Sequence, residues 1–175
     1  MKFKIFRFKK VKSTNNTAIR IIKSSNFDYG MVISETQNSG RGQYGKKWIS
    51  YKGNLFVSIF FSLEKINLNL KQLTKANVEL IKKLISFYYN KKIQLKPPND
   101  ILVNKMKICG ILQEIIQKNG VKYLIVGIGL NLVRSPNIHK YPTVNLYELT
   151  KTKISVNSIS KKLILIYKDF LKSQK

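Results

Sequence analysis

The second half of the chain contains four short apolar runs whose connections are too short to hold a helix. The runs cover residues 93–96, 100–103, 107–116 and 121–131. Pro97-Pro98 excludes regular helix between the first two runs. Asn104-Lys105-Met106 and Lys118-Asn119-Gly120 predict hairpin turns, the second through the Asn-Gly pair that two-residue turns favour. These connections predict a largely antiparallel sheet.

Periodic apolar residues predict three helices. The clearest is 70–90, where they recur every three or four positions, at Leu70, Leu73, Ala76, Leu80, Ile81, Leu84, Ile85 and Tyr88. Ser13 or Thr14 is expected to cap a helix that ends near Ser25 and buries Ala18, Ile21 and Ile22. Ser155 is expected to cap a last helix, with Val156, Ile159, Leu163, Ile166, Tyr167 and Phe170 facing inward.

Three further strands are expected at 2–12, 29–36 and 54–63, and 135–144 is expected to be a loop. The sequence shows no internal repeat and no low-complexity linker. The predicted architecture is therefore one α/β (α+β) domain over residues 1–175, with a mixed, largely antiparallel sheet backed by helices.

Length and composition limit the class of protein. The chain has 175 residues, of which 43% are apolar and 11% aromatic, so it can bury a sizeable core. Its apolar stretches are too short and too often broken by Lys to span a bilayer, and its alternating N-terminus is unlike a signal peptide. The single Cys109 cannot form an internal disulfide, and with His139 it makes no zinc cluster. A cytoplasmic protein without a membrane partner is expected.

The net charge of +25 arises from 33 basic and 8 acidic residues. Such a charge favours association with nucleic acid, an acidic membrane surface or an acidic protein. The basic residues are mostly Lys, scattered along the whole chain and accompanied by many Ile and Asn, which is the usual mark of an AT-rich coding sequence. We prefer this compositional interpretation, although the charge still favours acidic partners.

A glycine-punctuated basic segment, Gly40–Trp48, lies between two of the expected strands and is called the glycine loop below. Its three glycines let the backbone turn sharply and approach a ligand closely. Arg41 offers a planar fork of donors suited to carboxylate or phosphate, and Lys46 and Lys47 add positive charge. The loop alone predicts only that an anion is bound here.

Three further motifs make this interpretation specific. They are Ser13-Thr14-Asn15, the segment from Lys96 to Glu114, and Val126-Gly127-Ile128-Gly129-Leu130-Asn131. With the glycine loop, they resemble the catalytic domain of biotin protein ligases, also called biotin–[acetyl-CoA-carboxylase] ligases. The motifs follow the family's order over residues 13–146. The resemblance implies the fold of the biotin/lipoate ligase catalytic domain, which is like that of class II aminoacyl-tRNA synthetases.

The resemblance also implies a reaction. The carboxylate of biotin attacks the α-phosphate of ATP to give biotinyl-5′-AMP and pyrophosphate, and a lysine amine of a biotin carboxyl carrier protein then displaces AMP. ATP, Mg²⁺ and biotin are the implied cofactor, ion and substrate, and a homodimer is one possible assembly. This chemistry needs two anions brought together, charge neutralised and water excluded.

The family's functional residues map onto specific positions of this sequence. Arg41 and Lys107 are expected to be catalytic. The expected biotin-binding residues are Ser13, Thr14, Asn15, Gln37, Arg41, Gly42, Gln43 and Lys107. The expected nucleotide-binding residues are Gly40, Arg41, Trp48, Asn99, Asp100, Gly129 and Asn131. Asp100 is also a candidate Mg²⁺ ligand. Two positions keep an ordinary alternative, since Ser13 can be a helix cap and Trp48 a core residue.

The chain departs from the family pattern at three places. Gln43 stands where many members have an arginine that helps to retain the adenylate, and Pro97 stands where Trp is common. The chain is also expected to lack both the small C-terminal β-barrel domain and the N-terminal winged helix of regulatory members.

Three other functions are less consistent with the sequence. A lipoate or octanoate ligase shares the fold, but its glycine-rich and lysine motifs differ from those present here. A nucleic-acid-binding module would explain the charge, but the sequence has no zinc-ligand spacing, paired RNP-like aromatics or helix-turn-helix signal, so no specific nucleic-acid partner is expected. A degenerate ligase that binds biotin without activating it is disfavoured by Arg41, Asn99, Asp100 and Lys107.

Overall fold

The computed structural model describes residues 3–138 and 141–174 and contains one seven-stranded sheet. The elements in chain order are β1 (Lys4–Val11), α1 (Thr14–Ser24), β2 (Tyr29–Gln37), the 3₁₀ turn η1 (Gln43–Gly45), β3 (Leu55–Ser62), α2 (Leu70–Ser86), β4 (Ile93–Lys96), β5 (Asp100–Val103), β6 (Met106–Lys118), β7 (Val121–Leu130), α3 (Leu146–Thr150) and α4 (Val156–Lys172). The sheet order is β1-β2-β3-β7-β6-β5-β4. Only β1 and β2 pair in parallel, which confirms the expected mixed, largely antiparallel sheet.

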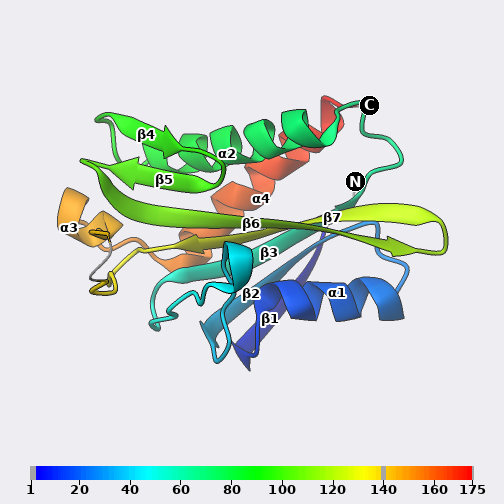
Figure 1. Ribbon diagram of the computed structural model, residues 1–175, viewed down its shortest axis with the longest axis horizontal. Coiled ribbons are helices and arrows are strands. Elements are labelled where there is room, and N and C mark those ends of the chain that lie inside the picture. The colour runs from blue at the N-terminus through cyan, green and yellow to red at the C-terminus, as the bar shows by residue number, and fades with distance from the viewer. Residues whose placement is uncertain (1–2, 139–140, 175) are drawn as a thin grey trace.

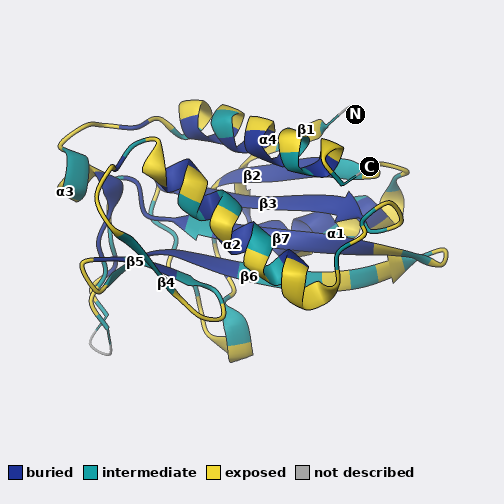
Figure 2. Ribbon diagram, turned by 90° about the horizontal axis from the view of Figure 1, so that it is seen from above, coloured by how far each residue is buried: buried dark blue, intermediate teal, exposed yellow. Residues whose placement is uncertain are grey.

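The two faces of the sheet are covered by different helices (Figure 1). Helix α1 lies on one face, where Ala18 and Ile22 pack against Val32, Phe60 and Ile125. Helices α2 and α4 lie on the other face, over the larger core cluster. Figure 2 shows the resulting pattern, with buried strands at the centre and exposed outer faces on the helices.

Local signals explain the strand connections. Asn119 and Gly120 have φ values of 48° and 82°, as the expected tight turn requires, and they join the long strands β6 and β7. Asn104 and Lys105 also adopt positive φ, at 49° and 64°, between β5 and β6. The chain therefore reverses at both predicted hairpins.

Helix boundaries differ from expectation in two places. Helix α2 ends at Ser86, four residues early, because the amides of Tyr88 and Tyr89 both bond back to the carbonyl of Ile85. Leu70, expected on its buried side, is 56% exposed. Leu70 is the first residue of the helix, where side chains point back toward the N-terminus and away from the following core-facing turns.

The C-terminal region contains one element that was not expected. Helix α3 spans only five residues, Leu146–Thr150, and is capped by Asn145, whose side chain accepts from the amide of Glu148. Helix α4 was expected, and Ser155 caps it by accepting from the amide of Ser158. No helix in the described part of the chain is both long and apolar enough to cross a membrane.

Candidate active site

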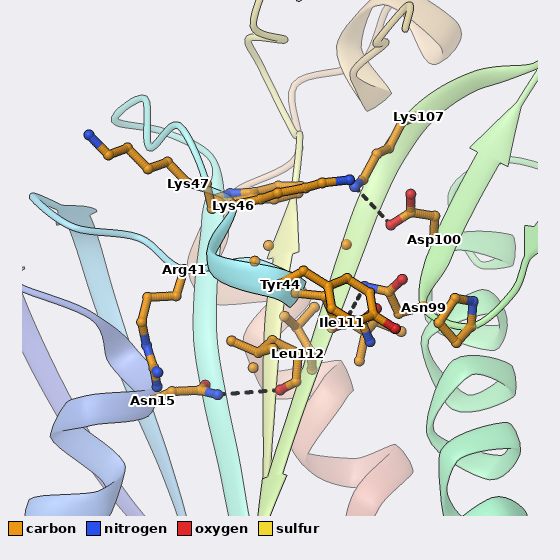
Figure 3. Close-up of a pocket in the computed structure, with 18 of the residues that line it drawn as sticks. Asn15, Arg41, Tyr44, Lys46, Lys47, Asn99, Asp100, Lys107, Ile111 and Leu112 are labelled. Atoms are coloured by element: carbon orange, nitrogen blue, oxygen red, sulfur yellow. Dashed lines mark hydrogen bonds and ion pairs between the residues drawn. The ribbon is translucent and has the colours of Figure 1, made fainter. Parts of the chain in front are cut away.

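A cavity of about 240 Å³ opens on the α1 side of the sheet, between the N-terminus of α1, the glycine loop and the β4–β5 turn. It brings together most of the site residues expected from sequence, which come from four separate parts of the chain (Figure 3). Those lining it are Ser13, Thr14, Asn15, Gln37, Arg41, Gly42, Gln43, Trp48, Asn99, Asp100, Lys107 and Gly129. Gly40 and Asn131 lie just outside it: Gly40 lines an adjacent hollow of about 440 Å³, and Asn131 lines another of about 20 Å³.

Hydrogen bonds join the N-terminus of α1 to the end of β2. The Ser13 hydroxyl caps the helix by accepting from the amide of Asn16 at 3.5 Å. Gln37 Oε1 accepts from both the amide and the hydroxyl of Thr14, at 2.8 and 3.2 Å, and Gln37 Nε2 donates to Ser50 at 3.2 Å. Ser13 is therefore both the cap of α1 and a residue that lines the cavity.

Asn15 is held in one orientation by three partners. Its Nδ2 donates to the carbonyl of Leu112 at 3.3 Å and to Glu114 Oε2 at 2.7 Å, and its Oδ1 accepts from the Ser58 hydroxyl at 2.5 Å. The amide lies directly over Gly127, where an added Cβ would come within 2.3 Å of Asn15 Oδ1. The glycine on β7 thus makes room for the amide, and the partners determine which end donates.

The glycine loop is closed by its own backbone. The amide of Gly42 donates to the carbonyl of Lys46 at 2.6 Å, and the amide of Trp48 donates to the carbonyl of Gly40 at 2.8 Å. At its tip, Tyr44 adopts φ 54° and is 91% exposed, and Figure 3 shows its side chain reaching from the loop over the cavity. A non-glycine residue in this left-handed region is uncommon and costs about 1 kcal/mol.

Arg41 leaves the loop toward α1 (Figure 3). Its Nη2 forms an ion pair with Glu114 Oε2 at 2.5 Å, while the Arg41 side chain stays 38% exposed. The guanidinium has five N–H donors, so the donors not facing Glu114 remain for an anion in the cavity.

Trp48 covers the glycines of the two central strands. Gly110 and Gly129 pair across β6 and β7, and an added Cβ at either would lie 2.6 or 2.3 Å from the Trp48 ring. The indole therefore lies flat on the sheet, with Lys107 Nζ 5.4 Å from its ring centroid. Trp48 Nε1 is buried against the sheet and has no hydrogen-bond partner within the described residues.

Lys107 and Asp100 form the charged pair at the other end of the cavity, 2.8 Å apart (Figure 3). The Lys107 backbone is fixed twice, through its amide to Pro142 and its carbonyl to the amide of Val144. Only 15% of its side chain is exposed, and its Nζ also lies 5.4 Å from the Tyr141 ring centroid. This enclosure holds a positive charge where it faces the cavity with little competing water.

The two asparagines expected at the nucleotide occupy different environments. Asn99 lines the cavity and donates from Nδ2 to the carbonyl of Ile111 at 2.9 Å. Asn131 is 2% exposed, and its Nδ2 donates to the carbonyl of Val144 at 3.2 Å, so it braces the segment behind Lys107.

The structure offers no preformed metal centre within the described residues. Asp100 is the only carboxylate lining the cavity there, and it already neutralises Lys107. Cys109 is fully buried, and His139 lies outside the described residues.

Sequence reasoning missed several residues that shape the cavity. Tyr44 and Tyr141 line it, and Ser58 and Glu114 orient its side chains. Glu114 carried a signal, since it follows Leu112 by two residues on β6 and strand side chains at that spacing share a face. Ser58 carried none, because only the packing of α1 on β3 brings it to Asn15.

Comparison with known proteins places the chain among protein ligases. The model of the Biotin/lipoate A/B protein ligase family matches residues 7–131, a range that contains all four motifs. The chain is similar to the bifunctional ligase/repressor BirA of Bacillus subtilis (strain 168), at 30% identity over 127 residues, which cover 71% of this chain and 39% of that protein. It is 35% identical to BirA of Escherichia coli (strain K12) over 107 residues, which cover 57% of this chain and 32% of that protein.

Among solved structures, the chain is similar to biotin protein ligase from Aquifex aeolicus in complex with biotin and ATP. The TM-score is 0.81 at 27% identity, covering 97% of this chain and 70% of that chain. The chain spans less than half the length of the two BirA proteins, at 39% and 32%. The family match nonetheless covers well over half of this chain. The chain belongs to the biotin/lipoate A/B protein ligase family.

Proposed function

We propose that this chain is the catalytic domain of a biotin protein ligase. In the first step, a biotin carboxylate oxygen bonds to the α-phosphorus of ATP, and the bond from that phosphorus to the bridging oxygen of pyrophosphate breaks. In the second, the ε-amine of a lysine on a biotin carboxyl carrier protein attacks the activated carbonyl, and AMP leaves with the former carboxylate oxygen. The amine loses a proton as the amide bond forms.

The hydrogen-bonding capacity at the α1 end of the cavity carries this proposal. Asn15 uses both amide hydrogens within the protein, but its Oδ1 keeps one lone pair after accepting from Ser58. Thr14 Oγ1 keeps lone pairs after donating to Gln37. Gln37 keeps one amide hydrogen beyond that given to Ser50, and Ser13 has a hydroxyl hydrogen that no described residue accepts.

This end of the cavity therefore presents both acceptors and donors. A ureido ring has two N–H groups and one carbonyl oxygen, so it can satisfy both kinds of group. The dithiolane ring of lipoate has neither a strong donor nor a strong acceptor, and its binding would leave these polar groups unpaired. The site thus favours biotin over lipoate.

Positive charge supports the activation step. Arg41 and Lys107 reach the cavity from the glycine loop and from β6, and we assign them the neutralisation of charge as two anions approach. Gly42 and Gln43 contribute the loop wall beside the biotin. Each donor that stabilises such a transition state contributes on the order of 10²- to 10³-fold in rate.

We assign the nucleotide to the end lined by Trp48, Asn99, Asp100 and Gly129, with Gly40 and Asn131 supporting that wall from outside. Trp48 lines the cavity at this end, and its flat indole suits packing against a nucleotide base or ribose. Mg²⁺ is proposed as the companion of ATP, coordinated chiefly by phosphates, with Asp100 as the nearby carboxylate.

The setting of the reaction is also proposed. A buried, reduced Cys109 suits a reducing compartment, which supports a cytoplasmic location. The partner is a carrier protein and not a specific nucleic acid. A homodimer stays a prediction that sedimentation velocity would test.

Pyrophosphate release that depends on both biotin and ATP tests the function directly. The wild type is expected to release pyrophosphate and to label a carrier domain with biotin in preference to lipoate. Lys107→Ala should lower the rate by about 10²- to 10³-fold, whereas Lys71→Ala, at an exposed position on α2, should leave it unchanged. Preferred labelling by lipoate, or no release by the wild type, would refute the proposal.

A further inference from the structure

One carboxylate oxygen connects the glycine loop to α1. Glu114 Oε2 accepts from Arg41 Nη2 at 2.5 Å and from Asn15 Nδ2 at 2.7 Å. The three residues come from the loop, β6 and the first turn of α1, and Figure 3 shows Arg41 reaching down beside Asn15. The bonded residues are 73 and 99 positions apart in the sequence, so these contacts depend on the tertiary fold.

The surroundings distinguish this pair from an ordinary surface ion pair. The Glu114 side chain is only 25% exposed, and Asn15 is 2% exposed. Asn15 in turn accepts from the fully buried Ser58, so a continuous chain of hydrogen bonds leads from β3 through α1 to Arg41. Charge-assisted bonds of this kind are stronger and more directional than solvated ones.

We infer that Glu114 is a positioning residue that latches the glycine loop onto α1. Its carboxylate sets the direction of Arg41 and, by accepting from Nδ2, forces Asn15 Oδ1 to face Ser58 and the cavity. Without that carboxylate, the Asn15 amide loses its shorter Nδ2 hydrogen bond and is held only by the Leu112 carbonyl and the Ser58 hydroxyl, so its lone pair is less firmly directed at a ligand N–H. Arg41 loses its only ion-pair partner within the described residues.

The effect on the ligand rests on the proposed function, whereas the effect on the loop does not. Loop closure is visible in the amides of Gly42 and Trp48, which bond across the loop to Lys46 and Gly40. Biotin affinity should depend on the latch through both Arg41 and Asn15. The two effects can therefore be measured separately.

Hydrogen exchange in the free protein tests the latch itself. Glu114→Gln keeps the shape of the side chain and removes its charge, so the Gly42 and Trp48 amides should exchange about three- to tenfold faster. Glu35→Gln is the matched control, because Glu35 also pairs with a lysine, Lys52, at 3.1 Å but touches neither Arg41 nor Asn15. Equal exchange in wild type and Glu114→Gln would overturn the inference.

A second variant separates the latch from a general loss of packing. Arg41→Gln should speed loop exchange by a similar factor, and the double variant should exchange no faster than either single one, because both remove the same contact. Additive effects would show that Arg41 and Glu114 act independently and would overturn the latch.

Calorimetric titration with biotin completes the test. Glu114→Gln should weaken biotin binding about three- to tenfold, while Glu35→Gln should bind as the wild type does. Tighter binding by Glu114→Gln would mean that the carboxylate competes for Arg41, which overturns the positioning role. If the wild type binds no biotin, the proposed function fails, and loop exchange alone decides for or against the latch.

Discussion

Burial sets the ionisation of two side chains in the larger core. Cys109 and Tyr167 are each 0% exposed, and loss of hydration raises the pKa of both groups far above its ordinary value. For Cys109, Lys107 lowers the pKa and Asp100 raises it, both by less than burial does. Neither group carries charge in the folded protein at neutral pH. Each group therefore lowers the free energy of unfolding once the pH is high enough for the unfolded chain to lose that proton.

Stability should therefore fall in alkali. Below the ordinary thiol pKa of 9.0, folded and unfolded chains are both protonated at Cys109. Above it, only the unfolded chain releases the proton, so the free energy of unfolding declines by about 1.4 kcal/mol per pH unit. Cys109→Ala should remove this part of the decline in urea unfolding between pH 8 and pH 10. An equal slope in the variant and the wild type would contradict the assignment.

A second prediction concerns Gln43 and the retention of the biotinyl-AMP intermediate. Its side chain lines the cavity at the start of η1, next to Gly42. Gln43→Gly removes this wall and places a further flexible residue in the loop, so more free biotinyl-AMP should escape, by about two- to fivefold. The measurement is chromatography of the released adenylate, with Lys71→Ala as control. Equal release by variant and wild type would show that other groups retain it.

The residues that could be predicted are those inside motifs. Arg41, Asn99 and Lys107 were expected at a site because their local sequence resembles a known pattern, and they line one cavity. Ser58 could not be assigned a role in advance, and Glu114 could be assigned only to the cavity face of β6. Their contacts with Asn15 depend on how α1 packs on the sheet. The residues next to them in the sequence do not determine that packing.

At the scale of elements, turn chemistry was the reliable signal. The Asn119-Gly120 hairpin fixed the pairing of β6 with β7, and the capping residues Ser13 and Ser155 marked the starts of two helices. Helix α3 was missed because five residues are too few to show a helical period. The end of α2 was missed because backbone bonds to Ile85, and not an apolar pattern, decide it.

The fit of Trp48 on two strands leads to a prediction about packing. Gly129→Ala places a methyl group against the indole, so it should lower the free energy of unfolding by about 1–3 kcal/mol. In a Trp48→Leu background, the same change should cost much less, because the ring is gone. Urea unfolding of the four proteins gives the comparison. An equal cost in both backgrounds would show that the ring does not limit position 129.

At the scale of the whole molecule, the net charge of +25 follows directly from the sequence, but the sequence does not show which function the charge serves. The mixed sheet and its covering helices could be predicted from the apolar pattern and from the resemblance. The lysines are spread over several elements, so no single patch identifies a partner. Long-range attraction depends on their sum and not on their exact placement.

The charge should show itself in the rate of association. For an acidic carrier domain, the partner that the proposed function implies, the rate constant for binding should fall by at least about fivefold between 50 and 300 mM salt. Stopped-flow fluorescence would measure it, and the dissociation rate should change less. A rate constant that does not vary with salt would remove any role for the charge in encounter.

The sheet order has a consequence for synthesis of the protein. All eight residues of β3 are buried, yet half of their pairing comes from β7, where Leu55 faces Leu130. A nascent chain on the ribosome therefore carries a largely apolar strand with one edge unpaired until residue 130 has left the exit tunnel. Folding must wait for this distant pairing, which makes it slow and exposes the unfinished chain to aggregation. Chaperone capture of ribosome-bound chains is thus expected to peak before that length and to decline after it.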